Sequence, residues 1–388
     1  MPKRFAYLKY PYLFLFAVLS AWGILQPEYT WDLLGYIGSA TRSTDAVVIH
    51  DTALNALHSV RATPELQADL PYRVDMIANP YHFAEQLPFY SIKPLYVALI
   101  QGLHSEGLPF PRATVTISAV SNFVLAVILW LWLAPYLNGL ATAGACTLIM
   151  LSPNILVLSR WATPDCLATA VAALGLYLIL ERKNFFWGSA ILVFDIWIRT
   201  DALILAGLVF AVLLFLRKLD LWQAATLSAT ALASYFAINH LGGNYGWPAL
   251  FYNSFLGGIV APGEMLVHIS FSAYLHQLVR GTYMWFTFGA FPFYMLLGGL
   301  AVWLNRSSIY SYMILTVLGA RILSYFLYPN GDQRYTAVLF VLVPVALVIA
   351  VSRHAAPSAN HHLSSPRASQ LPQLDLEQDM ATSAAAVR

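Results

Sequence analysis

Residues 113–134 read ATVTISAVSNFVLAVILWLWLA, and this stretch decides the class of fold. It carries no charged side chain and is long enough to cross a bilayer core, which takes ~20 apolar residues in a helix. The whole chain of 388 residues shares this character, because 59% of its residues are hydrophobic and only 10% are charged. A soluble domain carries about 25% charged residues. We therefore expect an all-α protein, a polytopic transmembrane helical bundle.

Other apolar stretches extend this pattern to about ten spans, several of them shorter than a straight crossing needs. Residues 92–103 are expected to lie in the membrane interface or to re-enter it, because this segment has about a dozen residues and begins beside Lys93-Pro94. The expected spans are residues 10–26, 113–134, 138–158, 166–181, 185–198, 202–216, 221–240, 284–304, 308–327 and 335–351.

The basic residues between spans indicate the orientation. If 92–103 does not cross, the connectors containing Arg182-Lys183, Arg217-Lys218 and Arg306 share one side with the basic start of the chain, which the positive-inside rule makes cytoplasmic. We read the start as an uncleaved signal anchor, because no A-x-A-like site follows its apolar run. The expected architecture is a membrane domain, 1–351, with external loops 26–112 and 241–283 and a disordered cytoplasmic tail, 352–388.

The composition also excludes several classes of partner. The net charge of +2 implies neither an acidic nor a basic partner, and no basic cluster with interleaved aromatics suggests nucleic acid. Two cysteines in apolar surroundings make neither a disulfide framework nor a metal site. No histidine pair has metal-protease spacing, and no glycine-rich phosphate loop follows a strand.

Two carboxylates, Glu28 and Asp32, follow the first span within QPEYTWDLLGYIG, residues 26–38. Acids at a bilayer boundary are costly and usually have a partner or a role. They would share one face if the first helix continued through them. One reading makes them a general base or metal-holding carboxylates; the other makes them an interfacial pair in an aromatic belt anchored by Trp31.

Asp165 lies in a second outer connector and Asp201 in a third. Each acid has a structural explanation, since Thr163-Pro164 and Thr200 are typical helix-start residues and an acid in the first turn suits the helix dipole. That explanation leaves out the nearby arginines, Arg160 and Arg199. Arginine has a planar fork that suits phosphate, so we expect a bound anion.

Three further cations extend this expectation. Arg321 lies within the span 308–327, where an arginine is a functional candidate, although snorkelling to the surface is the alternative. Arg334 precedes the last span, and Lys93 lies on the interfacial segment within reach of a lipid headgroup. The expected phosphate-binding residues are Arg334, Arg321, Lys93, Arg160 and Arg199.

In its order of features, the chain resembles the GT-C class of integral-membrane glycosyltransferases over residues 1–350. The features are the acid after the first span, YSIKPLY (90–96), SPNILVLSRWATPD (152–165), Arg-Thr-Asp (199–201) and YPNGDQRY (328–335). The resemblance implies a polyprenyl-phosphate sugar as donor, Asp32 as the first-loop catalytic aspartate and Asp165 as the second-loop acid. It differs in lacking an adjacent acid pair at position 32, which leaves open a divalent metal, Mg²⁺ or Mn²⁺, held by Asp32 and Asp165.

The resulting expectation is inverting transfer of a single hexose or pentose to a glycan, lipid or protein acceptor, with Asp32 as base and Glu28 and Asp165 as further catalytic acids. The expected place is the periplasmic face of a bacterial inner membrane. A polysaccharide polymerase or ligase, a transporter or lipid flippase, and a non-catalytic scaffold are the alternatives. A transporter would predict broken helices and ionisable residues deep in several spans, of which Asp195 and Arg321 are candidates.

Overall fold

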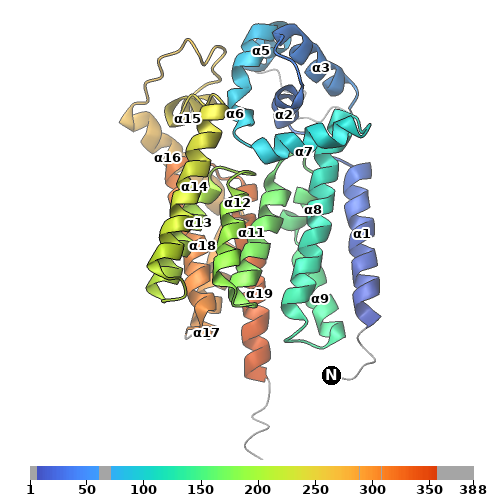
Figure 1. Ribbon diagram of the computed structural model, residues 1–388, viewed down its shortest axis with the longest axis vertical. Helices are drawn as coiled ribbons and strands as arrows, with labels where there is room; N and C mark the ends of the chain where they lie inside the picture. Colours follow the sequence, from blue (N-terminus) through green and yellow to red (C-terminus); the bar gives the residue numbers. More distant parts are fainter. Residues whose placement is uncertain (1–6, 61–70, 288, 307, 356–388) are drawn as a thin grey trace, which may run out of the picture.

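In the computed structural model, residues 7–60, 71–287, 289–306 and 308–355 are described, and every regular element among them is a helix. The expected all-α fold is therefore confirmed for this part of the chain. Figure 1 shows long, roughly parallel helices with a layer of shorter helices across one end. The predicted tail lies outside the described residues from position 356 onward, as do Lys3 and Arg4.

Each predicted span corresponds to a helix or to a bent pair of helices. They are α1 (Lys9–Leu25), α8 (Phe110–Leu133), α9 (Gly139–Met150) with α10 (Pro153–Leu156) and η2 (Val157–Ser159), α11 (Asp165–Leu180), α12 (Phe185–Asp195), α13 (Ala202–Phe215), α14 (Leu221–Leu241), α16 (Phe271–Thr287) with α17 (Phe291–Leu304), α18 (Ile309–Leu327) and α19 (Ala337–Ala355).

Two of these segments are bent where the sequence suggested one continuous helix. The axes of α9 and the α10–η2 segment meet at 70°, and those of α16 and α17 meet at 74°. The first bend follows from Pro153, which has no amide hydrogen for the ladder and forces the preceding Ser152 into an extended conformation, with ψ at 135°.

The described residues contain three helices that are long and apolar enough to cross a membrane: α8, α18 and the helical segment Arg334–His354, which consists of most of η3 (Gln333–Thr336) and nearly all of α19. Counting each bent pair as one span raises this number to five, and α1, α11, α12 and α13 are shorter apolar helices. The protein thus has the helices of a membrane protein. Ten crossings remain a prediction.

Helix α11 lies inside the bundle between α8, α12 and α19. Its contact with α12 is especially close, because a Cβ built on Gly188 would lie 2.7 Å from the Gly175 carbonyl oxygen. Small residues let helix backbones approach in this way in membrane proteins. Large apolar side chains such as Trp132 and Phe340 fill the rest of the core.

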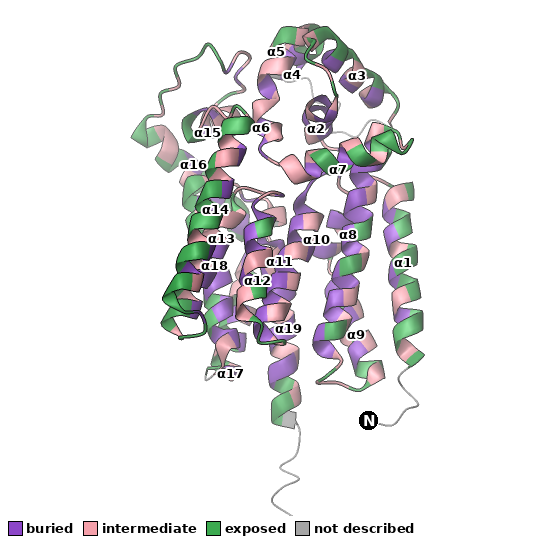
Figure 2. Ribbon diagram, viewed as in Figure 1, coloured by how far each residue is buried: buried purple, intermediate pink, exposed green. Residues whose placement is uncertain are grey.

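The layer across one end is here called the upper cap, and in residues 7–60 and 71–112 it comprises six helices of the predicted first loop. Figure 2 shows exposed outer faces on the helices farthest from the bundle, whereas the helix that begins at Asp32 lies beneath them with no exposed residue. Helix α7 lies across the ends of the bundle helices, as expected for an interfacial segment (Figure 1). The cap helices are α2 (Asp32–Ala40), α3 (Ala46–His58), α4 (Pro71–Ala78), α5 (Pro80–Gln86), α6 (Pro88–Ser91) and α7 (Pro94–Ser105).

The second predicted loop packs against this cap. Its helix α15 (Trp247–Phe255) and the segment after it contact α6, where Phe89 packs with Ala249 and Ile259. The Gly263 amide also donates a hydrogen bond to Glu85 Oε2 at 3.2 Å. The two loops thus form one structure at the same end of the bundle.

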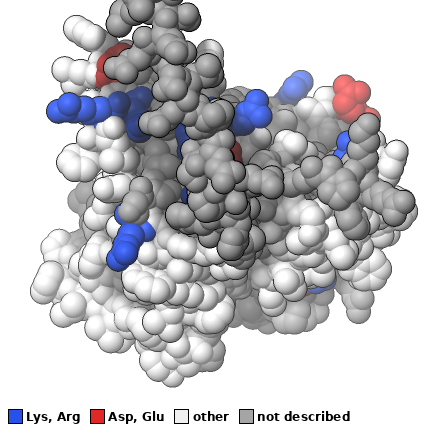
Figure 3. Space-filling model, turned by 90° about the horizontal axis from the view of Figure 1, so that it is seen from below, with Lys and Arg blue, Asp and Glu red and all other residues white. Residues whose placement is uncertain are grey.

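The opposite, lower end carries the basic connectors. Both ends of the described chain lie there, together with the turns after α11, α13 and α17 (Figure 1). The view from below shows Lys and Arg side chains among mostly uncharged residues (Figure 3). The sequence-based expectation that these connectors share one side holds within the described residues, whereas the identity of that side stays a prediction.

We predict that Gly188→Val will lower the thermal unfolding midpoint of the detergent-solubilised protein. The new side chain would force α11 and α12 apart, and overpacking of this kind costs about 1–3 kcal/mol. Gly207→Val is the matched control, because no atom lies within 4 Å of the position its Cβ would take. Equal midpoints for the two variants would contradict the proposed close contact.

Candidate active site

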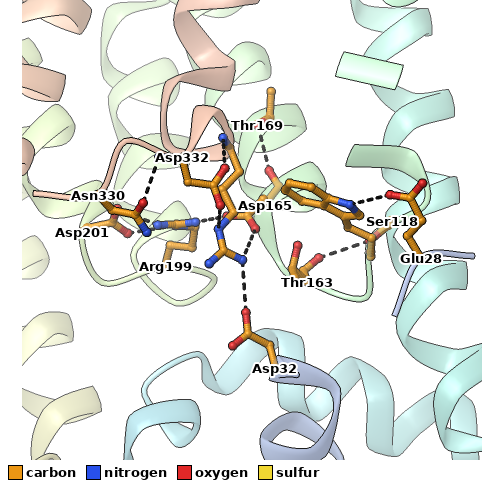
Figure 4. Close-up of polar contacts among 12 residues, drawn as sticks. Glu28, Asp32, Ser118, Thr163, Asp165, Thr169, Arg199, Asp201, Asn330 and Asp332 are labelled. Atoms are coloured by element: carbon orange, nitrogen blue, oxygen red, sulfur yellow. Dashed lines mark hydrogen bonds and ion pairs between the residues drawn. The ribbon is translucent and has the colours of Figure 1, made fainter. Parts of the chain in front are cut away.

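Asp32 begins α2, and its carboxylate faces the bundle below the cap (Figure 4). Helix α1 ends at Leu25, so the helix does not continue through Glu28 and the two acids do not share a helical face. The aromatic neighbours Tyr29, Trp31 and Tyr36 are buried within the protein, which argues against the alternative reading of an aromatic belt in the membrane interface. The side chain of Asp32 itself is 30% exposed.

Arg334, in the short helix η3 (Gln333–Thr336), connects Asp32 to the bundle. Its guanidinium donates a hydrogen bond to Asp32 Oδ2 at 3.1 Å and lies 3.9 Å from Asp165 Oδ2. The Nε atom lies 3.0 Å from Asp332 Oδ2. One cation is therefore shared by three carboxylates that come from separate parts of the chain.

Asp165 is almost fully buried at the start of α11 and forms an ion pair with Arg199. Arg199 also binds Asp201 with two hydrogen bonds, at 3.0 and 2.9 Å. Burial would raise the pKa of Asp201, but the charge and hydrogen bonds of Arg199 hold that pKa below its ordinary value. Asp165 is thus the first residue of α11 and Asp201 directly precedes α13, as expected, and Arg199 binds both carboxylates.

The predicted helix-cap roles of the threonines are wrong. No side-chain hydrogen bond caps α11 or α13, and the residues at their cap positions are Pro164 and Asp201. The buried Thr163 hydroxyl has no hydrogen-bond partner among the described residues. The acids beside these threonines face the arginines instead, because a buried carboxylate gains more from a guanidinium than from a helix dipole.

Glu28 lies away from Asp32 (Figure 4) and forms a separate contact with Arg160. Arg160 lies 2.7 Å from one carboxylate oxygen of Glu28, and the Trp161 indole donates to the other at 2.9 Å. A backbone bridge between Glu28 and Trp161 reinforces the contact. The pair fastens the chain after α1 to the segment before α11, and neither residue lines the cavities described below.

Arg321 is buried in α18 and has no carboxylate partner within hydrogen-bond distance among the described residues. It donates to the Asn330 carbonyl at 2.8 Å, and its guanidinium lies over the rings of Trp285 and Tyr335. Its Nε has no hydrogen-bond partner in the described structure. The alternative reading, in which Arg321 snorkels to the surface, is therefore not observed.

Lys93 lies where α6 meets α7 and contacts the rings of Tyr36 and Tyr90. Its ammonium donates to the Phe89 carbonyl at 3.2 Å. Burial lowers the pKa of Lys93 to about 8, although the nearby Asp32 acts in the opposite direction. Lys93 thus lies close enough to the carboxylate to sense its charge.

Two cavities meet at Arg334. An outer, mainly polar cavity of about 350 Å³ is lined by Asp32, Trp161 and residues of the cap. An inner cavity of about 90 Å³ is lined by Asp165, Arg199 and Arg321. Arg334 lines both cavities, so its guanidinium lies between the space in front of Asp32 and the more deeply buried arginines.

Some residues of this site were not predicted. Tyr335 lies under three guanidinium groups, those of Arg199, Arg321 and Arg334, at 4.6 to 5.5 Å from its ring centre. Its position beside Arg334 in YPNGDQRY was the available signal. Arg73, which lines the outer cavity over Trp31, lies in the first loop without a motif that would identify it.

No group of three or more His, Cys, Asp or Glu side chains suited to a metal ion is found in the described part of the chain. Asp32 and Asp165, the predicted ligands, both lie near the Arg334 guanidinium, and a nearby cation opposes the binding of a second one. Comparisons with protein-family models, with curated proteins and with solved structures gave no match.

We predict that Asp165→Ala will destabilise the protein much more than Glu28→Ala. Removing one partner of a buried pair leaves an uncompensated charge and costs about 3–5 kcal/mol, whereas an exposed pair contributes about 0–1 kcal/mol. Asp165 is 2% exposed in its side chain and Glu28 is 37% exposed. Thermal unfolding in detergent should show a large loss for the first variant only; similar midpoints would contradict this assignment.

Proposed function

We propose that this protein is a membrane glycosyltransferase that moves a single sugar from a polyprenyl-phosphate donor to an acceptor, with Asp32 as general base. The observation that carries the proposal is the position of Arg334 between Asp32 and the buried arginines. A proton acceptor and phosphate-binding cations therefore lie side by side at one end of an apolar bundle. That is the arrangement that a lipid-borne phosphate donor and a water-borne acceptor require.

In the proposed reaction, the acceptor hydroxyl enters the outer cavity and gives its proton to Asp32. Its oxygen forms a bond to the anomeric carbon of the sugar as the bond from that carbon to the phosphate oxygen breaks. The electron pair of the broken bond leaves with the polyprenyl phosphate. Arg334, assisted by Arg199, Arg321 and Lys93, neutralises this charge. Attack from the face opposite the phosphate inverts the anomeric centre.

The remaining predicted residues receive different roles. Asp165 holds Arg199 and Arg334 in place, which makes it a positioning residue rather than a group that touches substrate. Glu28 and Arg160 fasten the chain behind the site. The functional metal ion stays an open part of the proposal, and Mg²⁺ or Mn²⁺ would have to displace Arg334 to reach both aspartates.

We further propose that the cap faces the periplasm of a bacterial inner membrane and that the chain crosses the membrane about ten times. The basic connectors gather at the end away from the cap, and cytoplasmic connectors carry the excess of Lys and Arg. Cysteine labelling at Ser105 in the cap and at Arg182 in a connector tests this orientation. Labelling of both positions from the same side would contradict it.

We expect Asp32→Asn to lower turnover by about 10²–10⁴-fold, because a general base contributes that much to rate. The assay uses purified protein, a panel of polyprenyl-phosphate sugars and detection of the released polyprenyl phosphate. Glu28→Gln is the matched control and should retain activity, since its carboxylate lies outside the cavities. A folded Asp32→Asn variant with unchanged turnover would remove Asp32 from the mechanism.

The donor affinity should also depend on pH through Lys93. Below about pH 8 its ammonium is protonated and attracts phosphate, and above that pH the charge is lost, so kcat/KM for the donor should fall as pH rises from 7 to 9. In Lys93→Arg the cation persists and this fall should disappear. The same decline in both proteins would mean that another group is responsible.

A transporter is the second candidate, and two observations favour it. Two helix pairs are bent, and the buried side chains of Asp195 and Arg321 line the inner cavity. Broken helices and ionisable groups inside the bundle are features of transporters. Proteoliposomes loaded with a labelled polyprenyl-phosphate sugar distinguish the two: movement of the intact donor across the bilayer without bond cleavage favours a transporter.

A further inference from the structure

A third cavity, of about 400 Å³, opens at the lower end of the bundle, far from the cap. It lies between the connectors that follow α11, α13 and α17. Two lysines, Lys183 and Lys218, line it together with the hydroxyl-bearing residues Ser308 and Tyr312 and with apolar side chains. None of these residues belongs to the candidate active site.

No carboxylate of the described residues forms a direct ion pair with the lysines of this cavity. The neighbouring acids are engaged elsewhere: Glu181 accepts hydrogen bonds from Tyr136 and Tyr310, and Asp220 caps α14 through the Gln223 amide. The Lys183 ammonium donates one hydrogen bond to the Leu180 carbonyl oxygen, which leaves two of its three N–H groups for an anion. The Lys218 ammonium has a contact with the Phe185 ring.

The two lysines also repel each other. Burial lowers the pKa of Lys183, and the charges of Arg353 and Lys218 lower it further, although Glu181 opposes this. Lys218 reaches across to α12, where its ammonium lies 5.8 Å from the centre of the Phe185 ring. An anion between the two lysines would relieve this repulsion.

The start of α18 adds to the positive field. Ser308 caps this 19-residue helix by accepting a hydrogen bond from the Tyr310 amide at 3.2 Å. Because the first amides of a helix carry partial positive charge, they favour phosphate groups placed near them. The helix terminus and the two lysines come from different parts of the chain, yet they line the same cavity.

An apolar surface runs from the cavity along the outside of the bundle. Tyr312 lines the cavity, and Leu315, three residues later on the same face of α18, is 54% exposed. Phe215, beside the cavity residue Leu216, is 76% exposed. A ligand with a phosphate in the cavity could therefore lay a hydrocarbon chain on this surface.

We propose that this cavity binds the phosphate headgroup of an anionic membrane lipid from the leaflet at the lower end. Lys183 and Lys218 hold the phosphate oxygens, the hydroxyls of Ser308 and Tyr312 lie within the same cavity, and the acyl chains cover α18 and the end of α13. Basic pockets between membrane helices bind anionic lipid headgroups in this way.

The test compares two double variants of the full-length protein. Lys183→Gln/Lys218→Gln removes the cavity charges, and Arg182→Gln/Arg217→Gln removes the same number of charges from the same connectors outside the cavity. Native mass spectrometry, after incubation with equal amounts of phosphatidylglycerol and phosphatidylcholine, measures the bound lipid. We expect Lys183→Gln/Lys218→Gln to retain about tenfold less phosphatidylglycerol than the unaltered protein, because each lost charge-assisted hydrogen bond weakens binding. Arg182→Gln/Arg217→Gln should retain nearly all of it.

Two additional arms make the result decisive. Lys183→Arg/Lys218→Arg should keep the lipid, which separates loss of charge from loss of folding, and its unfolding midpoint is compared with that of the glutamine variant. In a further arm, inorganic phosphate is added as a soluble competitor, and the remaining bound phosphatidylglycerol is measured. Equal loss of lipid in Lys183→Gln/Lys218→Gln and in Arg182→Gln/Arg217→Gln would contradict the site, and so would equal binding of the two lipids. If inorganic phosphate binds as tightly as phosphatidylglycerol, a lipid is not the specific occupant of the site.

Discussion

The burial of the Asp165 carboxylate is the constraint on which this structure depends. A carboxylate that is 3% exposed in an apolar bundle is tolerable only if cations satisfy it, and Arg199 and Arg334 do so. These arginines precede α13 and α19, so a single acid fixes the relative positions of three helix ends. The same requirement concentrates positive charge where the bundle meets the cap.

The cap supplies the other half of the site. Helix α2 brings Asp32 into contact with Arg334. The junction between α6 and α7 places the Lys93 ammonium near the rings of Tyr36 and Tyr90. The arginines, in turn, lie over the ring of Tyr335. A guanidinium that stacks on an aromatic face keeps its hydrogen-bonding edge free for other partners. Arg321 can therefore lie near Arg199 and Arg334 over the same ring, although it has no carboxylate partner of its own among the described residues.

The hydrophobic pattern of the sequence predicted most of the helices, whereas the pairing of charged side chains depended on local turns that the sequence did not reveal. The apolar runs located the bundle helices, and the length of 92–103 correctly separated α7 from the upright helices. Arg160 and Arg199 were named from positive charge placed against the orientation rule, and Arg321 from its place within a span. Arg334 was added as a further outer cation. Asp32 and Asp165 were singled out as acids at the bilayer boundary, and the family resemblance implied their roles. The spacing of residues along the sequence could not predict which carboxylate would pair with which arginine. Glu28 and Arg160 looked like members of the same set, but the turn after Leu25 pairs them with each other.

The backbone hydrogen bond from the Leu95 amide to the Trp197 carbonyl, at 3.0 Å, has a mechanical consequence. It joins the first turn of α7 to the loop that carries Arg199, and Lys93 lies just two residues before Leu95. Any tilting of α7 must either break this bond or carry the loop along. A displacement of α7 that preserves this bond would therefore move Lys93 together with the loop that carries Arg199, the residue that binds Asp165.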